Sequence, residues 1–193
     1  MSESQIVNAT RKWVEDVVVG YNLCPFAKRE LVRDRVRFVV SSAETEDELV
    51  QAVHEELQRL NDEPEIETTL LVHPQVLQDF SAYNEFLDVT DGLLAYLELE
   101  GVYQIASFHP DYQFADTDPD AAENYTNRSP YPMLHLLREA SLERAIESYP
   151  DVEGIPQRNI ELMDELGADK MKAILHSCFE AANSISPKFS ISF

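Results

Sequence analysis

Two histidine–proline pairs carry much of the chemistry that this sequence offers. His73 and His109 each precede a proline, and each follows a short apolar run, at 68–72 and 103–108. Proline disfavours the α-helical conformation in the residue before it, so each imidazole is expected to be extended where a strand leaves the sheet. Such imidazoles ligate metals or transfer protons. The alternative is a polar strand terminator bonded to a loop carbonyl.

The chain after His109 supplies further groups for the same site. His109 is the candidate metal ligand or general acid/base, and Asp111 would orient it or share the metal. A helix predicted over 132–148 would place His135 and Glu139 on one side. The candidates for binding an anionic substrate are Arg128, Ser129, Tyr131 and Arg138, and the candidate metal ligands are His73, His109, His135 and Glu139. The alternative is a helix start whose surface polar residues pair among themselves.

Cys24 follows the first predicted helix, with Lys28 and Arg29 nearby in sequence. Cations favour the thiolate, so Cys24 is a candidate catalytic nucleophile if a histidine approaches it. In the site around His109, we expect Cys24 and His135 to line the pocket. The alternative is a cysteine that is buried among apolar neighbours.

Two common ligand loops are excluded. The five glycines are scattered and assemble neither a phosphate-binding loop nor a dinucleotide fingerprint, so no nucleotide cofactor is expected. Residues 116–120 begin like a calcium loop, but Ala121 and Asn127 stand where glycine and glutamate are required. The cofactor is therefore unknown, with a divalent metal as an open option.

Hydrophobic spacing predicts the elements that must position these groups. Strands are predicted at 36–40, 68–72 and 103–108, and helices over 6–18, 45–60, 79–97, 132–148, 156–166 and 169–183. A further strand is considered at 21–26 or in the C-terminal tail. This alternation predicts an α/β fold with a small, mostly parallel sheet of at least three strands, covered by helices and followed by a helical C-terminal third. The site would lie at the carboxyl ends of the strands, under a loop formed by residues 111–127.

Composition limits the partners. The chain has 193 residues, which favours a single domain over 1–193, and its 36 acidic and 15 basic residues give a formal charge of −21. This charge disfavours nucleic acids and anionic membranes, and no apolar stretch approaches the ~18 residues that span a bilayer. With two cysteines and no export segment at the N-terminus, the cytoplasm is the expected location. The oligomeric state is open.

Three segments are similar to those of a known family. NLCPFAK at 22–28, IASFHPDYQFA at 105–115 and NYTNRSPYPMLHLLREAS at 124–141 resemble a bacterial family of roughly this length that is known only as a domain of unknown function. The likeness covers nearly the whole chain. It implies a bacterial cytosolic protein, and it brings no established activity, cofactor or catalytic residue.

Three functions are compatible with these features. The first is a small enzyme, a hydrolase or group transferase acting on a small anionic substrate, with an optional metal and a site at the carboxyl ends of the strands. The second is a noncatalytic module that binds a small-molecule ligand or a protein through the aromatic loop residues Tyr112, Phe114, Tyr125 and Tyr131. The third is a thiol-dependent enzyme centred on Cys24.

Overall fold

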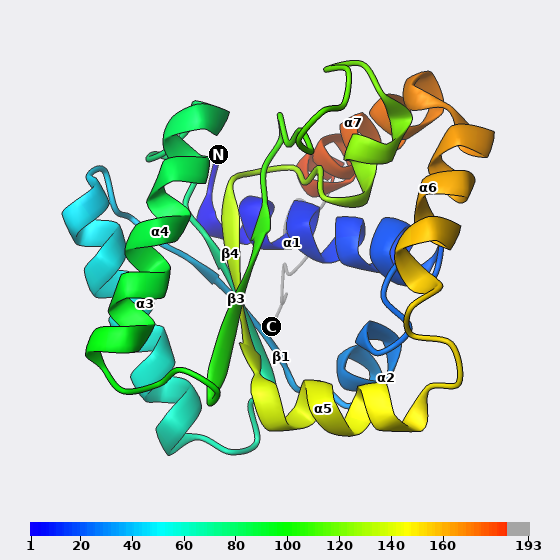
Figure 1. The fold of residues 1–193 in the computed structure, drawn as a ribbon. Helices are drawn as coiled ribbons and strands as arrows, with labels where there is room; N and C mark the ends of the chain where they lie inside the picture. Colours follow the sequence, from blue (N-terminus) through cyan, green and yellow to red (C-terminus); the bar gives the residue numbers. More distant parts are fainter. Residues whose placement is uncertain (185–193) are drawn as a thin grey trace, which may run out of the picture.

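A four-stranded sheet separates two layers of helices (Figure 1). The computed structural model describes residues 1–184, so the strand considered in the C-terminal tail lies outside the described residues. The strands are β1 (Val36–Val40), β2 (Thr68–Val72), β3 (Tyr103–Phe108) and β4 (Met133–Arg138). The helices are α1 (Glu3–Trp13), which continues into the π-helical segment η1 (Val14–Val19), α2 (Ala27–Val32), α3 (Glu46–Asp62), α4 (Phe80–Tyr96), the 3₁₀ helix η2 (Ala122–Thr126), α5 (Glu139–Ser148), α6 (Ile155–Leu166) and α7 (Ala168–Ser184).

The strand order is β1-β2-β4-β3, and β4 runs antiparallel to both of its neighbours. Only β1 and β2 pair in parallel. The prediction of a mostly parallel sheet is therefore wrong, because it missed β4. The α/β class is confirmed, and the three predicted strands form with the predicted bounds. Residues 21–26 form turns and bends instead of a strand.

The fourth strand occupies the first half of the helix predicted over 132–148. Leu134 and Leu136 pack into the core under α3 and α4, while His135 and Leu137 face the opposite side of the sheet. A central strand with apolar residues on both faces cannot be told from a buried helical turn by periodicity alone. As a result α5 begins only at Glu139, and the described residues after it form the helices α5, α6 and α7 with short connections.

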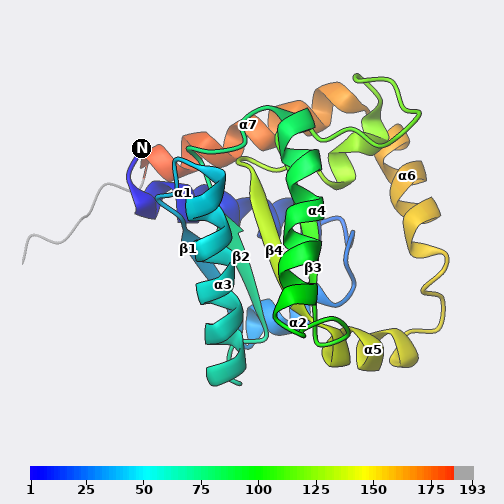
Figure 2. The same cartoon turned by 60° about the vertical axis from the view of Figure 1, so that its left-hand side comes forward.

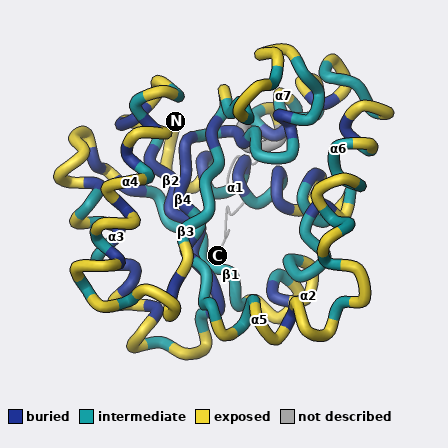
Figure 3. The backbone as a smooth tube through the Cα atoms, in the orientation of Figure 1, coloured by how far each residue is buried: buried dark blue, intermediate teal, exposed yellow. Residues whose placement is uncertain are grey.

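The helices cover the two faces unequally. Helices α3 and α4 lie together against one face, where a buried stripe that includes Leu49, Val53 and Leu57 completes a closed core (Figure 2). Helices α1 and α7 pack against each other on the other side, and α2 and α5 lie below them (Figure 1). The dark, buried stretches in Figure 3 follow β2, part of β4 and the inward sides of the helices, whereas β1 and most of β3 are intermediate. Within residues 1–184 we find no helix that is long and apolar enough to cross a bilayer.

Candidate functional site

A cavity of about 260 Å³ lies between the sheet and the segment that runs from α1 to α2, with α5 closing its lower side. We call it the sheet cavity. Its wall is mostly apolar, with contributions from Trp13, Phe26, Leu70, Phe108 and Leu142. The polar side chains on its lining are Cys24, Arg29, Glu30, Glu67, Thr68, His135, Arg138 and Ser141. An apolar wall with a few convergent polar groups is the usual construction of a small-molecule site.

The strand register produces the floor of this cavity. Leu70, His135 and Ala106 lie side by side on β2, β4 and β3. Ala106 has the smallest side chain of the three, and this leaves space above the sheet. Of these three residues, His135 is the polar one, and it lies between the other two.

The hydrogen bonds of His135 determine its tautomer. The Thr68 hydroxyl donates its single hydrogen to the Leu136 carbonyl at 2.6 Å, so at 2.7 Å from His135 Nε2 it must act as acceptor. His135 therefore carries its hydrogen on Nε2. Nδ1 keeps a free lone pair, with no hydrogen-bond partner among the described residues. Burial lowers the pKa of His135 to about 4, so the ring is neutral at pH 7.

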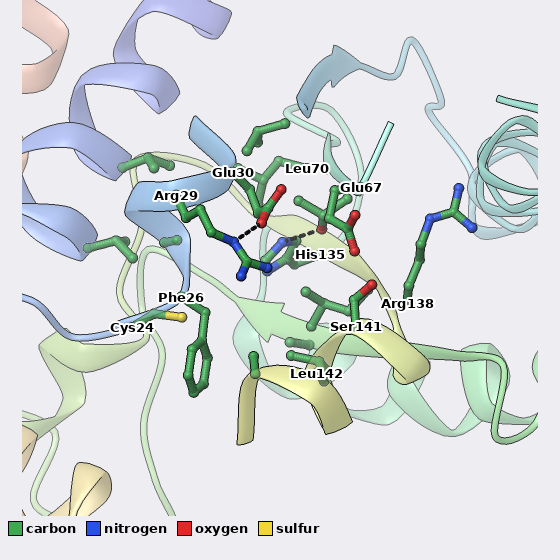
Figure 4. A pocket seen from close by; sticks show the side chains of 18 of the residues that line it. Cys24, Phe26, Arg29, Glu30, Glu67, Leu70, His135, Arg138, Ser141 and Leu142 are labelled. Carbon is green, nitrogen blue, oxygen red and sulfur yellow. Dashed lines mark hydrogen bonds and ion pairs between the residues drawn. The ribbon is translucent and has the colours of Figure 1, made fainter. Parts of the chain in front are cut away.

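Two buried carboxylates lie beside His135 (Figure 4). Glu67 Oε2 pairs with Arg35 at 2.6 Å, and the same guanidinium reaches Glu30 at 3.4 Å. Arg29 binds the other oxygen of Glu30 at 2.6 Å. Glu67 Oε1 is buried and has no hydrogen-bond partner within the part of the chain that the structure describes. A buried carboxylate oxygen without a partner costs free energy, so it marks a place where a ligand donor would stabilise the protein.

Cys24 lies across the cavity from these carboxylates, next to Phe26 (Figure 4). Burial raises the pKa of the thiol, and hydrogen bonds from the backbone amides of Phe26 and Ala27 offset only part of this effect. Neither Lys28 nor Arg29 is among the groups that shift it, although their closeness in sequence predicted a stabilised thiolate. Cys24 and His135 line the same cavity, but His109, around which their pocket was expected, does not line it.

A second cavity of about 380 Å³ adjoins the first, and we call it the loop cavity. Val18, Cys24 and Phe108 line both cavities. Its other walls come from α6 and from the segment 114–127, so part of the loop that we expected to cover a site does cover a cavity. The buried amide of Asn124 holds this loop by accepting from the Phe114 amide and the Thr117 hydroxyl.

The two histidine–proline pairs do lie at one edge of the sheet, because β2 and β3 run in the same direction on either side of β4. The Tyr83 ring contacts both imidazoles, with centroids 5.8 Å from His73 and 5.0 Å from His109. His109 Nε2 donates to the Leu77 carbonyl, and Nδ1 accepts from the Asp111 amide at 3.0 Å. Both ring nitrogens are thus occupied by backbone groups, as the strand-terminator alternative expects.

His73 is fully buried and differs from His109 in one respect. Its Nδ1 donates to the Val76 carbonyl, while Nε2 is buried without a partner in the described chain. Burial lowers the pKa of His73 to about 4 and also lowers that of His109. The Asp111 side chain is exposed, and this residue meets His109 through its backbone.

The residues predicted to bind an anion have other partners. Arg128 donates to the carbonyls of Tyr112 and Pro119 and stacks on the ring of Tyr125. Ser129 donates to the Tyr131 carbonyl. In a similar way the Tyr131 ring packs on Phe179 at 5.4 Å, and its hydroxyl contacts Met1. These groups fix the loop and the N-terminus.

Arg138 lines the sheet cavity, but its guanidinium donates to the carbonyls of Leu60 and Ile66, where it ties the end of α3 to the start of β2. Glu139 begins α5, and its amide donates to the Val102 carbonyl. The structure does not assemble His73, His109, His135 and Glu139, because His135 faces the sheet cavity while His73 and His109 contact α4 on the other face. No group of three or more potential metal ligands occurs within residues 1–184.

The sequence reasoning missed Glu30 and Glu67. Glu67 directly precedes the buried run 68–72, and a charged residue at the entry of a buried strand is the signal that could have found it. Glu30 lies on the short helix α2, whose turn-rich surroundings gave no periodicity to read.

Comparison with known proteins identifies a family for this chain but no activity. No curated protein and no solved structure matches it. A family model does match, over residues 5–173, and it carries the description Protein of unknown function (DUF1415). That match spans most of the chain, including Cys24, Glu67 and His135 and both cavities, and the chain therefore belongs to the DUF1415 family.

Proposed function

We propose that this protein binds a small, mostly apolar organic molecule in the sheet cavity. The observation that carries the proposal is the combination of an apolar cavity of about 260 Å³ with a buried acceptor on its lining, Glu67 Oε1, that has no hydrogen-bond partner in the described chain. An apolar cavity of 150 Å³ holds benzene, so by proportion this one suits a molecule of about ten non-hydrogen atoms. Apolar contact would supply most of the affinity, and the polar end would orient the molecule.

This proposal keeps the ligand binding of the second expected function but moves it from the aromatic loop to the sheet cavity, whose lining includes none of the four aromatic residues named for that function. The hydrolase or transferase at the carboxyl ends of the strands has less support, because backbone groups occupy both ring nitrogens of His109 and two backbone carbonyls accept from Arg128. The thiol-dependent enzyme also has less support, because burial raises the pKa of Cys24. Its location on both cavities nevertheless makes Cys24 a useful probe of occupancy.

Trp13 offers a direct assay, since it is the only tryptophan of the chain and lines the cavity. The experiment titrates the wild-type protein with 2-phenylethanol and follows tryptophan fluorescence. We expect a saturable change with one site. In Ala106→Leu, which fills the floor of the cavity, the change should be lost. In Ala173→Leu, a matched substitution at an exposed position of α7, it should persist. Absence of a saturable change in the wild type would contradict the proposal, as would an unaltered titration of Ala106→Leu.

A further inference from the structure

The polar end of the sheet cavity offers hydrogen-bond acceptors. Glu67 Oε1 is buried without a partner in the described chain, and Nδ1 of His135, on the same cavity, carries a lone pair. The Thr68 hydroxyl, which contacts His135 Nε2, gives no donor to these acceptors, because it donates to the Leu136 carbonyl. A ligand group that brings N–H or O–H donors would satisfy such acceptors.

The arrangement of charge distinguishes among such donors. Glu30 and Glu67 are only 7 % and 8 % exposed. The side chains of their partners Arg29 and Arg35 are 59 % and 31 % exposed. The negative charges therefore lie toward the cavity, and the positive charges lie toward solvent. Since water screens an exposed charge far more than a buried one, the cavity favours a cation.

An anion finds weaker support at the same end. The Arg138 guanidinium donates to the carbonyls of Leu60 and Ile66. Arg35 donates to both carboxylates and to the carbonyls of residues 64 and 65. Arg29 keeps donors free, but its largely exposed side chain is paired with Glu30. A carboxylate in the cavity would also meet Glu67 as a like charge.

We infer that the occupant of the sheet cavity is an amine in its ammonium form, carried on an apolar body, with the ammonium donating to Glu67 Oε1. This inference rests on the proposed function and specifies its ligand class. An ammonium donates a charge-assisted hydrogen bond to this unpartnered oxygen and places its charge beside a buried carboxylate. An aryl or alkyl body that brings the molecule to about ten non-hydrogen atoms fills the apolar remainder.

Calorimetric titration of the wild-type protein with three probes of similar size tests the inference. The probes are 2-phenylethylamine as the ammonium, 2-phenylethanol as the neutral donor and phenylacetate as the anion. A hydrogen bond to a charged partner is roughly twice as strong as a neutral one, so we expect the ammonium to bind about tenfold more tightly than the alcohol. Phenylacetate should bind most weakly. If the alcohol binds and the ammonium binds no better, the inference fails while the proposed function stands. If phenylacetate binds more tightly than the alcohol, Arg29 recognises an anion and the inference is wrong.

The variant Glu67→Gln removes the charge and keeps an acceptor oxygen. It should reduce the affinity for 2-phenylethylamine about tenfold and leave that for 2-phenylethanol within about twofold. Glu56→Gln is the matched control, because Glu56 forms a comparable buried pair with Arg37, at 2.7 Å, outside the cavity lining. An unchanged ammonium-to-alcohol ratio in Glu67→Gln would overturn the inference. The ranking of probes on the wild type decides the question even if this variant does not fold.

Discussion

Filling the sheet cavity should make the protein more stable. Ala106 lies on the cavity floor, opposite His135 in the register, and Ala106→Leu adds three carbon atoms to that floor. Full burial of those carbons would contribute about 2 kcal/mol, at ~0.8 kcal/mol for each. Strain from imperfect fit removes part of this gain, so we expect the free energy of unfolding to rise by about 1 kcal/mol. For a chain of this size the melting temperature should rise by roughly 2–4 °C.

Urea denaturation followed by far-ultraviolet circular dichroism measures this change without relying on Trp13, whose fluorescence the substitution alters. Ala173→Leu is the control, and its free energy of unfolding should stay within about 0.5 kcal/mol of the wild type. A loss of more than about 1 kcal/mol in Ala106→Leu, with an unchanged control, would refute the reasoning. It would mean that the space above Ala106 is already filled with well-packed atoms.

Three further predictions follow from the buried titratable groups. The free energy of unfolding should fall as the pH drops from about 6.5 to about 4, because His73 and His135 have a pKa of about 4 when folded and 6.5 ordinarily, so the unfolded chain takes up protons first. Urea midpoints measured across this pH range test the prediction. A fall equally steep in His135→Gln would contradict the contribution of His135. Alkylation of Cys24 by iodoacetamide should titrate above the ordinary pKa of a thiol and should slow when 2-phenylethylamine is present, and mass spectrometry of the modified peptide measures both. His109→Ala should lower the free energy of unfolding by about 2–4 kcal/mol, because the variant loses ring contacts and hydrogen bonds. The metal content of this variant, measured by elemental mass spectrometry, should equal that of the wild type. A metal that is lost from the variant would show that His109 is a metal ligand.

The parts of the fold that could be predicted have strong local signals. The helices predicted from residues 45 and 79 begin with local caps: Thr45 and Glu48 form a capping box at the start of α3, and Asp79 caps α4. The run 68–72 is buried at every position, as its apolar composition indicated. These features depend on interactions within a few residues, and a sequence displays such interactions directly.

Strand β4 and the sheet direction depend on contacts between distant segments. Residues 133–138 pair with β2 and β3, which precede them by dozens of residues, and nothing within six residues distinguishes that pairing from a helical turn. The misplaced helix also suggested that His135 and Glu139 act together. His135 instead lies within β4 and Glu139 begins α5, so an extended chain with a rise of about 3.3 Å per residue separates them by much more than one helical turn.

In the candidate site too, residue types could be predicted from the sequence and long-range contacts could not. Cys24 and His135 could be named from residue type, and the structure places both on the sheet cavity. Glu67 could not be named from residue type. It is a candidate because one of its carboxylate oxygens pairs with Arg35 while the other is buried without a partner in the described chain. The sequence also could not show that His109 spends both ring nitrogens on backbone groups.

A crystal structure with 4-bromophenethylamine would test the account most directly, because the anomalous signal of bromine locates the ligand without prior assumption. We expect bromine inside the sheet cavity, among Trp13, Phe108 and Leu142, with the ammonium within hydrogen-bond distance of Glu67 Oε1. A fully occupied ligand at the histidine edge beside His109, with the sheet cavity closed to it, would contradict the account.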